Sequence, residues 1–256
     1  MRNEKRTWLV EHEARKFKHH HNTSLFLTLQ SSGPEMTSLC LKGWCDTADD
    51  VFVIPYQYVN WRLKHTEQWI IQHFSKMLYH AKRLPQQAQW YMFAFDNNYI
   101  FVEKLINELG VFDPHLPIYT ILRDFKADFS HKPVLVFSRF ALNSFWDQAG
   151  EKCDFNIENV EDWLTSCMSV PPMKMSVDRN NKSRIFAIKR HFEVDELYKM
   201  PIGYHDDKEY IHSHSSSLLS FTNLSTSDLK LLPIFVEKVI GGSSRAENAK
   251  NMRINK

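Results

Sequence analysis

The stretch Leu116-Pro117-Ile118-Tyr119-Thr120-Ile121-Leu122-Arg123 decides the predicted fold. Its β-branched and aromatic residues favour a strand, which we place at about residues 116–124. Pro133 is typical of the first turn of a helix, so a helix is predicted over about 133–149. The apolar spacing that follows predicts another helix over about 157–169. The order is therefore strand, helix, helix.

The chain around this unit is predicted to be mainly helical. Alternating apolar residues at 25–29 and 51–54 predict short strands that form a small N-terminal sheet. Apolar residues recur on one helical face over 58–83, and a further helix is expected from Asn97, as its N-cap, to Gly110. The fold class is therefore α+β, mainly helical, with a ribbon-helix-helix element as a hypothesis.

Length and composition indicate a globular protein. The chain has 256 residues, of which 43% are hydrophobic and 13% aromatic, enough to bury a substantial core. We expect a single globular domain over residues 1–240, with the ribbon-helix-helix unit at 116–169. The polar segment 241–256 is expected to be a flexible tail.

The expected location is the cytoplasm. No apolar run approaches the roughly 20 residues that cross a bilayer, and the N-terminus carries charge where a signal peptide has its apolar segment. The four cysteines form no C-x-x-C pair, so in a reducing compartment we expect buried or incidental thiols rather than disulfides. They are Cys40, Cys45, Cys153 and Cys167.

No cofactor is expected. Histidines are densest at His19-His20-His21 and at His212 and His214, but neither group has ligands at a structural-zinc spacing. Whether His19–His21 or the Cys40/Cys45 pair binds a metal is left open.

Recognised catalytic motifs are missing from the sequence. It contains no phosphate-binding glycine loop of the forms G-x-x-x-x-G-K or G-x-G-x-x-G, no G-x-S-x-G and no H-E-x-x-H. The acid pairs Asp49-Asp50 and Asp206-Asp207 could serve acid–base roles, but adjacent acids are commonly part of a turn. We therefore expect neither enzyme activity nor a small-molecule substrate.

Charge permits only a local site for a polyanion, because the net charge is +2. Basic residues cluster in the first eighteen residues and between Lys174 and Arg190. In ribbon-helix-helix proteins two chains pair one strand each, and the resulting ribbon enters the major groove of DNA. The alternative is an ordinary αβ layer with Tyr119 and Arg123 on its surface.

Three short motifs resemble the AcaB-like regulators of conjugative plasmids and integrating conjugative elements. They lie at residues 60–67 (NWRLKHTE), 116–118 (LPI) and 160–164 (VEDWL), in the family's order. The resemblance implies a transcriptional regulator, an activator of transfer genes, that binds double-stranded DNA as a homodimer. The alternatives are a subunit of a nucleic-acid-processing enzyme, or a structural or protein-interaction component of a mobile element or phage.

The resemblance also implies DNA-binding residues. In the ribbon they would be Tyr119, Thr120, Ile121 and Arg123, with Arg123 reading guanine through its planar fork; which strand face points outward stays open. The implied phosphate contacts are Lys126, Lys132 and Asn156, and the implied accessory arm comprises Lys174, Arg179, Lys182, Arg184, Lys189 and Arg190.

Overall fold

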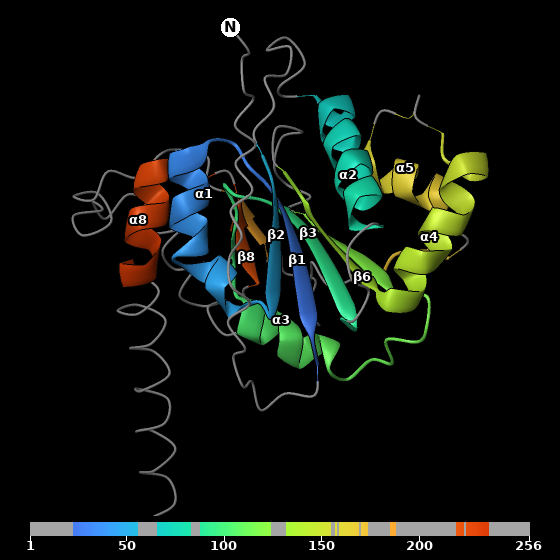
Figure 1. The fold of residues 1–256 in the computed structure, drawn as a ribbon, viewed down its shortest axis with the longest axis horizontal. Coiled ribbons are helices and arrows are strands. Elements are labelled where there is room, and N and C mark those ends of the chain that lie inside the picture. Colours follow the sequence, from blue (N-terminus) through green and yellow to red (C-terminus); the bar gives the residue numbers. More distant parts are fainter. Residues whose placement is uncertain are drawn as a thin grey trace, which may run out of the picture.

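A computed structural model shows helices on both faces of a five-stranded sheet (Figure 1). It describes residues 23–55, 66–82, 88–123, 132–154, 157, 159–168, 170–173, 185–187, 219–222 and 224–235. The sheet has the order β2 (Asp50–Ile54), β1 (Leu25–Gln30), β3 (Trp90–Phe95), β6 (Val134–Ser138) and β5 (Tyr119–Leu122). β1 pairs in parallel with β2 and β3, whereas β6 is antiparallel to both β3 and β5.

The helices form two layers. One face of the sheet packs against α1 (Pro34–Leu41), the 3-10 helix η1 (Trp44–Thr47) and α3 (Val102–Leu109). The other face packs against α2 (Glu67–Ala81), α4 (Arg139–Lys152) and α5 (Val160–Cys167). α8 (Thr226–Phe235) packs against α1, and Figure 1 shows both on the opposite side of the sheet from α2. A second sheet has the order β4 (Tyr99–Ile100), β8 (Ser220–Thr222) and β7 (Ile185–Ala187).

β3 is the strand on which both layers meet. All six of its residues are buried. Trp90, Met92 and Ala94 belong to the core beneath α1 and α3, whereas Tyr91, Phe93 and Phe95 belong to the core beneath α2, α4 and α5. A strand covered on both faces has a continuous apolar sequence, and Trp-Tyr-Met-Phe-Ala-Phe has that composition.

α2 carries the apolar face that the sequence predicts. Ile70, Phe74, Met77 and Ala81 are all buried against the sheet. The Thr66 hydroxyl accepts a hydrogen bond from the backbone N–H of Trp69 at 3.2 Å, which caps the helix. The described helix begins at Glu67, and the predicted start near residue 58 lies outside the described residues.

The ribbon-helix-helix prediction and the mainly helical fold class are wrong. Val134–Ser138, predicted as the first turn of a helix, is strand β6, and the helix begins after it with Ser138 as its N-cap. β5 pairs with β6 of the same chain, and all four β5 residues are buried. Both strands are short apolar runs, which suit a sheet covered on its two faces.

The outer edge of β5 is also occupied. The backbone N–H of Met173 donates to the Tyr119 carbonyl at 2.7 Å, and the Thr120 hydroxyl donates to the Met173 carbonyl at 2.7 Å. A strand from a second chain would have to displace this segment before it could pair with β5.

The four cysteines form two disulfides, so the expectation of free thiols is wrong. Cys40 of α1 pairs with Cys45 of η1, with their Cα atoms 5.3 Å apart. Cys153, which follows α4, pairs with Cys167 at the end of α5, with a Cα–Cα distance of 4.3 Å. Because Cys40 and Cys45 bind each other, they do not form a zinc site, and the histidines at 19–21, 212 and 214 lie outside the described residues.

None of the helices within the described ranges is long and apolar enough to cross a membrane. The cytoplasmic location stays a prediction, as does the division into a domain over residues 1–240 and a tail.

The Cys153–Cys167 disulfide is expected to stabilise the fold. The sequence separation of 14 closes a loop for which the chain-entropy estimate is about 3 kcal/mol. A Cys153→Ser, Cys167→Ser variant should therefore lose about 3 kcal/mol of unfolding free energy in urea titrations. The Cys40→Ser, Cys45→Ser variant opens a shorter loop and should lose about 2 kcal/mol. Equal stability of wild type and the first variant would contradict the assigned bond.

Candidate functional site

The carboxyl ends of four strands meet at one edge of the main sheet, because β1, β2, β3 and β5 all run in the same direction. The chain passes from β1 to β2 through α1 on one face, and from β2 across to β3 through α2 on the other. The strand order thus reverses between β1 and β3. In open α/β sheets, ligands bind outside the carboxyl ends of the strands at such a switch point.

Asp96 lies at this switch point, directly after β3, and is fully buried. Its Oδ2 accepts hydrogen bonds from the backbone N–H of Ser32, at 2.7 Å, and from the Thr37 hydroxyl, at 2.8 Å. Ser32 precedes α1 and Thr37 lies in its first turn, so the carboxyl group joins β3 to the N-terminus of α1. The positive end of the helix dipole favours a carboxylate there.

The turn after β3 holds buried polar atoms that have no hydrogen-bond partner among the described residues. They are Asp96 Oδ1, Asn97 Oδ1 and both amide atoms of Asn98. Thr222 ends β8, the strand that pairs with β4 directly after this turn, and its buried hydroxyl also has no hydrogen-bond partner among the described residues. A buried polar atom without a partner costs free energy, so this concentration at a switch point marks a candidate ligand site.

Burial raises the pKa of Asp96, while the hydrogen bonds from Ser32 and Thr37 and the positive charge of Lys132 lower it. Lys132 lies just before β6. Its Nζ is 4.8 Å from the ring centroid of Phe95 and 5.3 Å from that of Trp69, so aromatic faces hold the ammonium group near this edge.

His73 completes an aromatic cluster on the α2 side of the sheet. Its ring centroid is 3.9 Å from that of Trp69 and 6.1 Å from that of Phe95. Its Nδ1 is 2.8 Å from the Trp69 carbonyl oxygen, which can only accept, so Nδ1 carries a proton. Burial lowers the pKa of His73, which favours the neutral ring.

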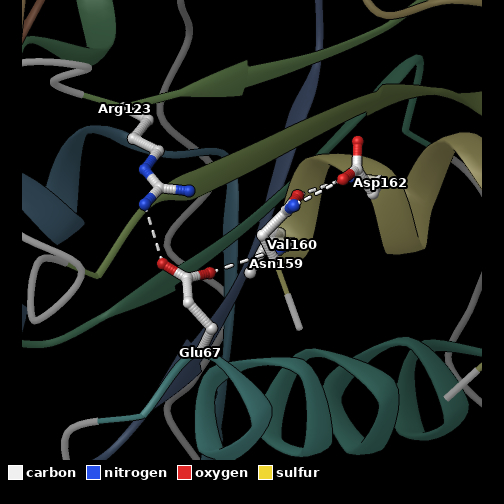
Figure 2. A network of polar contacts seen from close by, with 5 residues as sticks. All are labelled: Glu67, Arg123, Asn159, Val160 and Asp162. Atoms are coloured by element: carbon white, nitrogen blue, oxygen red, sulfur yellow. Dashed lines mark hydrogen bonds and ion pairs between the residues drawn. The ribbon is translucent and has the colours of Figure 1, made fainter. Parts of the chain in front are cut away.

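Glu67 organises a polar network beside this cluster (Figure 2). Its Oε1 accepts from the Arg123 guanidinium at 2.7 Å, and its Oε2 accepts from the backbone N–H of Val160 at 3.2 Å. The carboxylate therefore ties α2 to the end of β5 and to the start of α5. Asn159 and Asp162 close the first turn of α5: the Asp162 N–H donates to Asn159 Oδ1 at 2.8 Å. Burial raises the pKa of Glu67, and Arg123 and the Val160 hydrogen bond lower it.

The structure places few of the predicted DNA-binding residues at a surface. Tyr119, Thr120 and Ile121 are buried in β5, and burial raises the pKa of Tyr119 to about 12. Arg123 is bound to Glu67, and Lys132 lies over the aromatic rings. The other predicted residues lie outside the described ranges: Lys126, Asn156, Lys174, Arg179, Lys182, Arg184, Lys189 and Arg190.

Asp96 and Asn98 were not predicted from the sequence as site residues. Asn97 was predicted as the N-cap of a helix, but the helix starts at Val102, after the two-residue strand β4. The signal that could have revealed the site is the fully apolar run of β3 followed at once by Asp96-Asn97-Asn98.

Replacing Arg123 with Ala should destabilise the protein by about 3 kcal/mol, because it leaves the buried Glu67 carboxylate without its cation. The side chains of this pair are only 11% and 7% exposed. Lys230→Ala is the control, since Lys230 and Glu35 form an ion pair that is 56% and 67% exposed and should contribute under about 1 kcal/mol. Urea unfolding of both variants tests this; equal losses would contradict a structural role for Glu67.

Asp96→Asn should change how stability depends on pH. Because burial raises the pKa of Asp96 in the folded state, its contribution to stability is complete below the unfolded pKa of about 3.9 and is lost as pH rises through the folded pKa. The unfolding free energy of wild type should thus fall relative to that of Asp96→Asn as pH rises above about 4. Urea titrations at several pH values measure the difference, and a constant difference would refute the effect.

Comparison with known proteins points to one family. No protein-family model matches the sequence. The chain is 70% identical over 250 residues to "Uncharacterized protein F37A4.3" of Caenorhabditis elegans, covering 98% of this chain and 92% of that protein. An animal relative of this similarity conflicts with a role in plasmid conjugation, so that prediction is wrong, whereas the resemblance to AcaB-like regulators stays a prediction. A solved glycosyltransferase involved in the glycosylation of the major capsid of PBCV-1 aligns over 80% of this chain and 96% of its own, at 11% identity and a TM-score of 0.40, which does not establish a common fold. The chain belongs to the family of the C. elegans protein F37A4.3.

Proposed function

We propose that this protein binds a hydroxyl-rich small molecule, a ribonucleoside or sugar compound, at the carboxyl ends of β1 and β3. One observation carries the proposal: the turn at Asp96-Asn97-Asn98 holds four buried polar side-chain atoms that lack partners among the described residues, at the switch point of the sheet.

The chemistry of those atoms favours hydroxyl groups. Asp96 Oδ1, Asn97 Oδ1 and Asn98 Oδ1 can accept hydrogen bonds, and Asn98 Nδ2 can donate them. The ligand must therefore supply several donors and at least one acceptor within a small volume. Each hydroxyl of a sugar or ribose ring both donates and accepts, so neighbouring hydroxyls match adjacent carboxyl and amide groups.

The first turn of α1 does not suit a phosphate group. A helix N-terminus can bind phosphate through its N–H groups and its dipole. Here the Asp96 carboxyl group already accepts the Ser32 N–H and the Thr37 hydroxyl at that end of α1, so these donors are engaged and do not face a phosphate group.

This proposal differs from the expectation that no small molecule binds. It concerns binding, so the expectation that the protein is not an enzyme stays a prediction. Double-stranded DNA and a homodimeric state also stay predictions, because the structure contains a single chain.

Asn98→Ala tests the proposal directly. Uridine, adenosine, guanosine, glucose and galactose, each at millimolar concentration, would be screened by thermal shift. The affinity of any compound that raises the melting temperature would then be measured by calorimetry. Asn98→Ala should weaken binding at least about tenfold, because two hydrogen-bonding atoms are lost. Asn107→Ala, on the exposed side of α3, is the matched control and should bind as wild type does.

Two outcomes would contradict the proposed site. One is that none of these compounds raises the melting temperature of wild type. The other is that Asn98→Ala binds as tightly as Asn107→Ala, which would put the ligand elsewhere.

A further inference from the structure

Two disulfides, one in each helical layer, bear on where this chain folds. Cys40–Cys45 lies in the core beneath α1 and η1, and Cys153–Cys167 joins the ends of α4 and α5 on the opposite face. Cys40, Cys45 and Cys167 are fully buried, so both bonds are part of the packed interior. Disulfides persist in secretory compartments and are rare in the cytosol, where thiols are kept reduced.

A chain that folds in the secretory pathway can be glycosylated on asparagine in the pattern Asn-x-Ser/Thr, where x is not proline. The sequence contains three such tripeptides: Asn22-Thr23-Ser24, Asn181-Lys182-Ser183 and Asn223-Leu224-Ser225. All three become candidates only because the disulfides favour an oxidising compartment.

The described residues of the first and third tripeptides differ in how accessible they are. Leu224 is buried and its N–H donates to the Asn97 carbonyl at 3.0 Å. Ser225 donates its hydroxyl to Asp228 at 2.6 Å at the start of α8. Leu224 and Ser225 of the third tripeptide are thus held against the folded core. For the second, none of its residues is described.

Thr23 and Ser24 lie at a more accessible place. Both are partly exposed and directly precede β1. They lie at the amino end of the strand, whereas Asp96 lies at the carboxyl edge, next to the opposite end of β1. A bulky group at this position would leave the proposed ligand site open. We propose that this protein, contrary to the cytoplasmic location predicted from the sequence, matures in the secretory pathway and carries an N-linked glycan on Asn22.

The modification changes no oxidation state. The side-chain nitrogen of Asn22 forms a bond to the anomeric carbon of an oligosaccharide carried on a lipid pyrophosphate. The bond between that carbon and the pyrophosphate oxygen breaks, the lipid pyrophosphate leaves, and the amide nitrogen loses one proton.

The test uses the full chain produced in animal cells. Treatment with peptide N-glycosidase should increase its electrophoretic mobility, and intact mass spectrometry should show the loss of one glycan. Asn22→Gln and Ser24→Ala should abolish the shift. Ser24→Thr preserves both the tripeptide and a side-chain oxygen for the Gln89 N–H, which donates to Ser24 Oγ at 3.0 Å, so it should keep the shift.

A second readout follows the cysteines. In denatured protein, maleimide should label none of the four before reduction and all of them after reduction. The proposal is overturned if the glycosidase leaves wild type unchanged, if the shift survives in Asn22→Gln, or if the cysteines are labelled without reduction. None of these outcomes depends on ligand binding at Asp96.

Discussion

Burial of β3 on both faces is the constraint from which the rest of the structure follows. Its alternate side chains enter two separate cores, so helices must cover both sides of the sheet. α1 and α2 cover opposite faces of the sheet. The chain runs from β1 outward to β2 through α1, and then crosses back past β1 to β3 through α2. The same reversal leaves the carboxyl ends of β1 and β3 side by side, with Asp96 between them.

The sequence predicts some of these elements well and others not at all. β1 and β2 were predicted from alternation, and the apolar face of α2 from its helical spacing. β3 and β6 were missed because Trp90–Phe95 and Val134–Ser138 are continuous apolar runs. Periodicity cannot separate such a run from a buried helical segment. The error at β6 turned an interior sheet strand into the first turn of a helix and produced the ribbon-helix-helix hypothesis.

The candidate site depends on contacts that sequence order does not reveal. Asp96 lies two residues before Asn98 in sequence, but its partners Ser32 and Thr37 precede it by about sixty residues and become neighbours only when β1 and β3 pair. Arg123 illustrates the same limit. Its basic character suggested a nucleic-acid contact, whereas the fold pairs it with Glu67, where it stabilises the junction of α2, β5 and α5.

The Met173 segment has a consequence for solubility. β5 ends the sheet, and an edge strand with unpaired backbone groups is a template for aggregation. The two hydrogen bonds that Met173 exchanges with Tyr119 and Thr120 occupy part of that edge. Loss of this contact would expose an apolar strand, so Met173 protects the folded protein from edge-to-edge association at this edge.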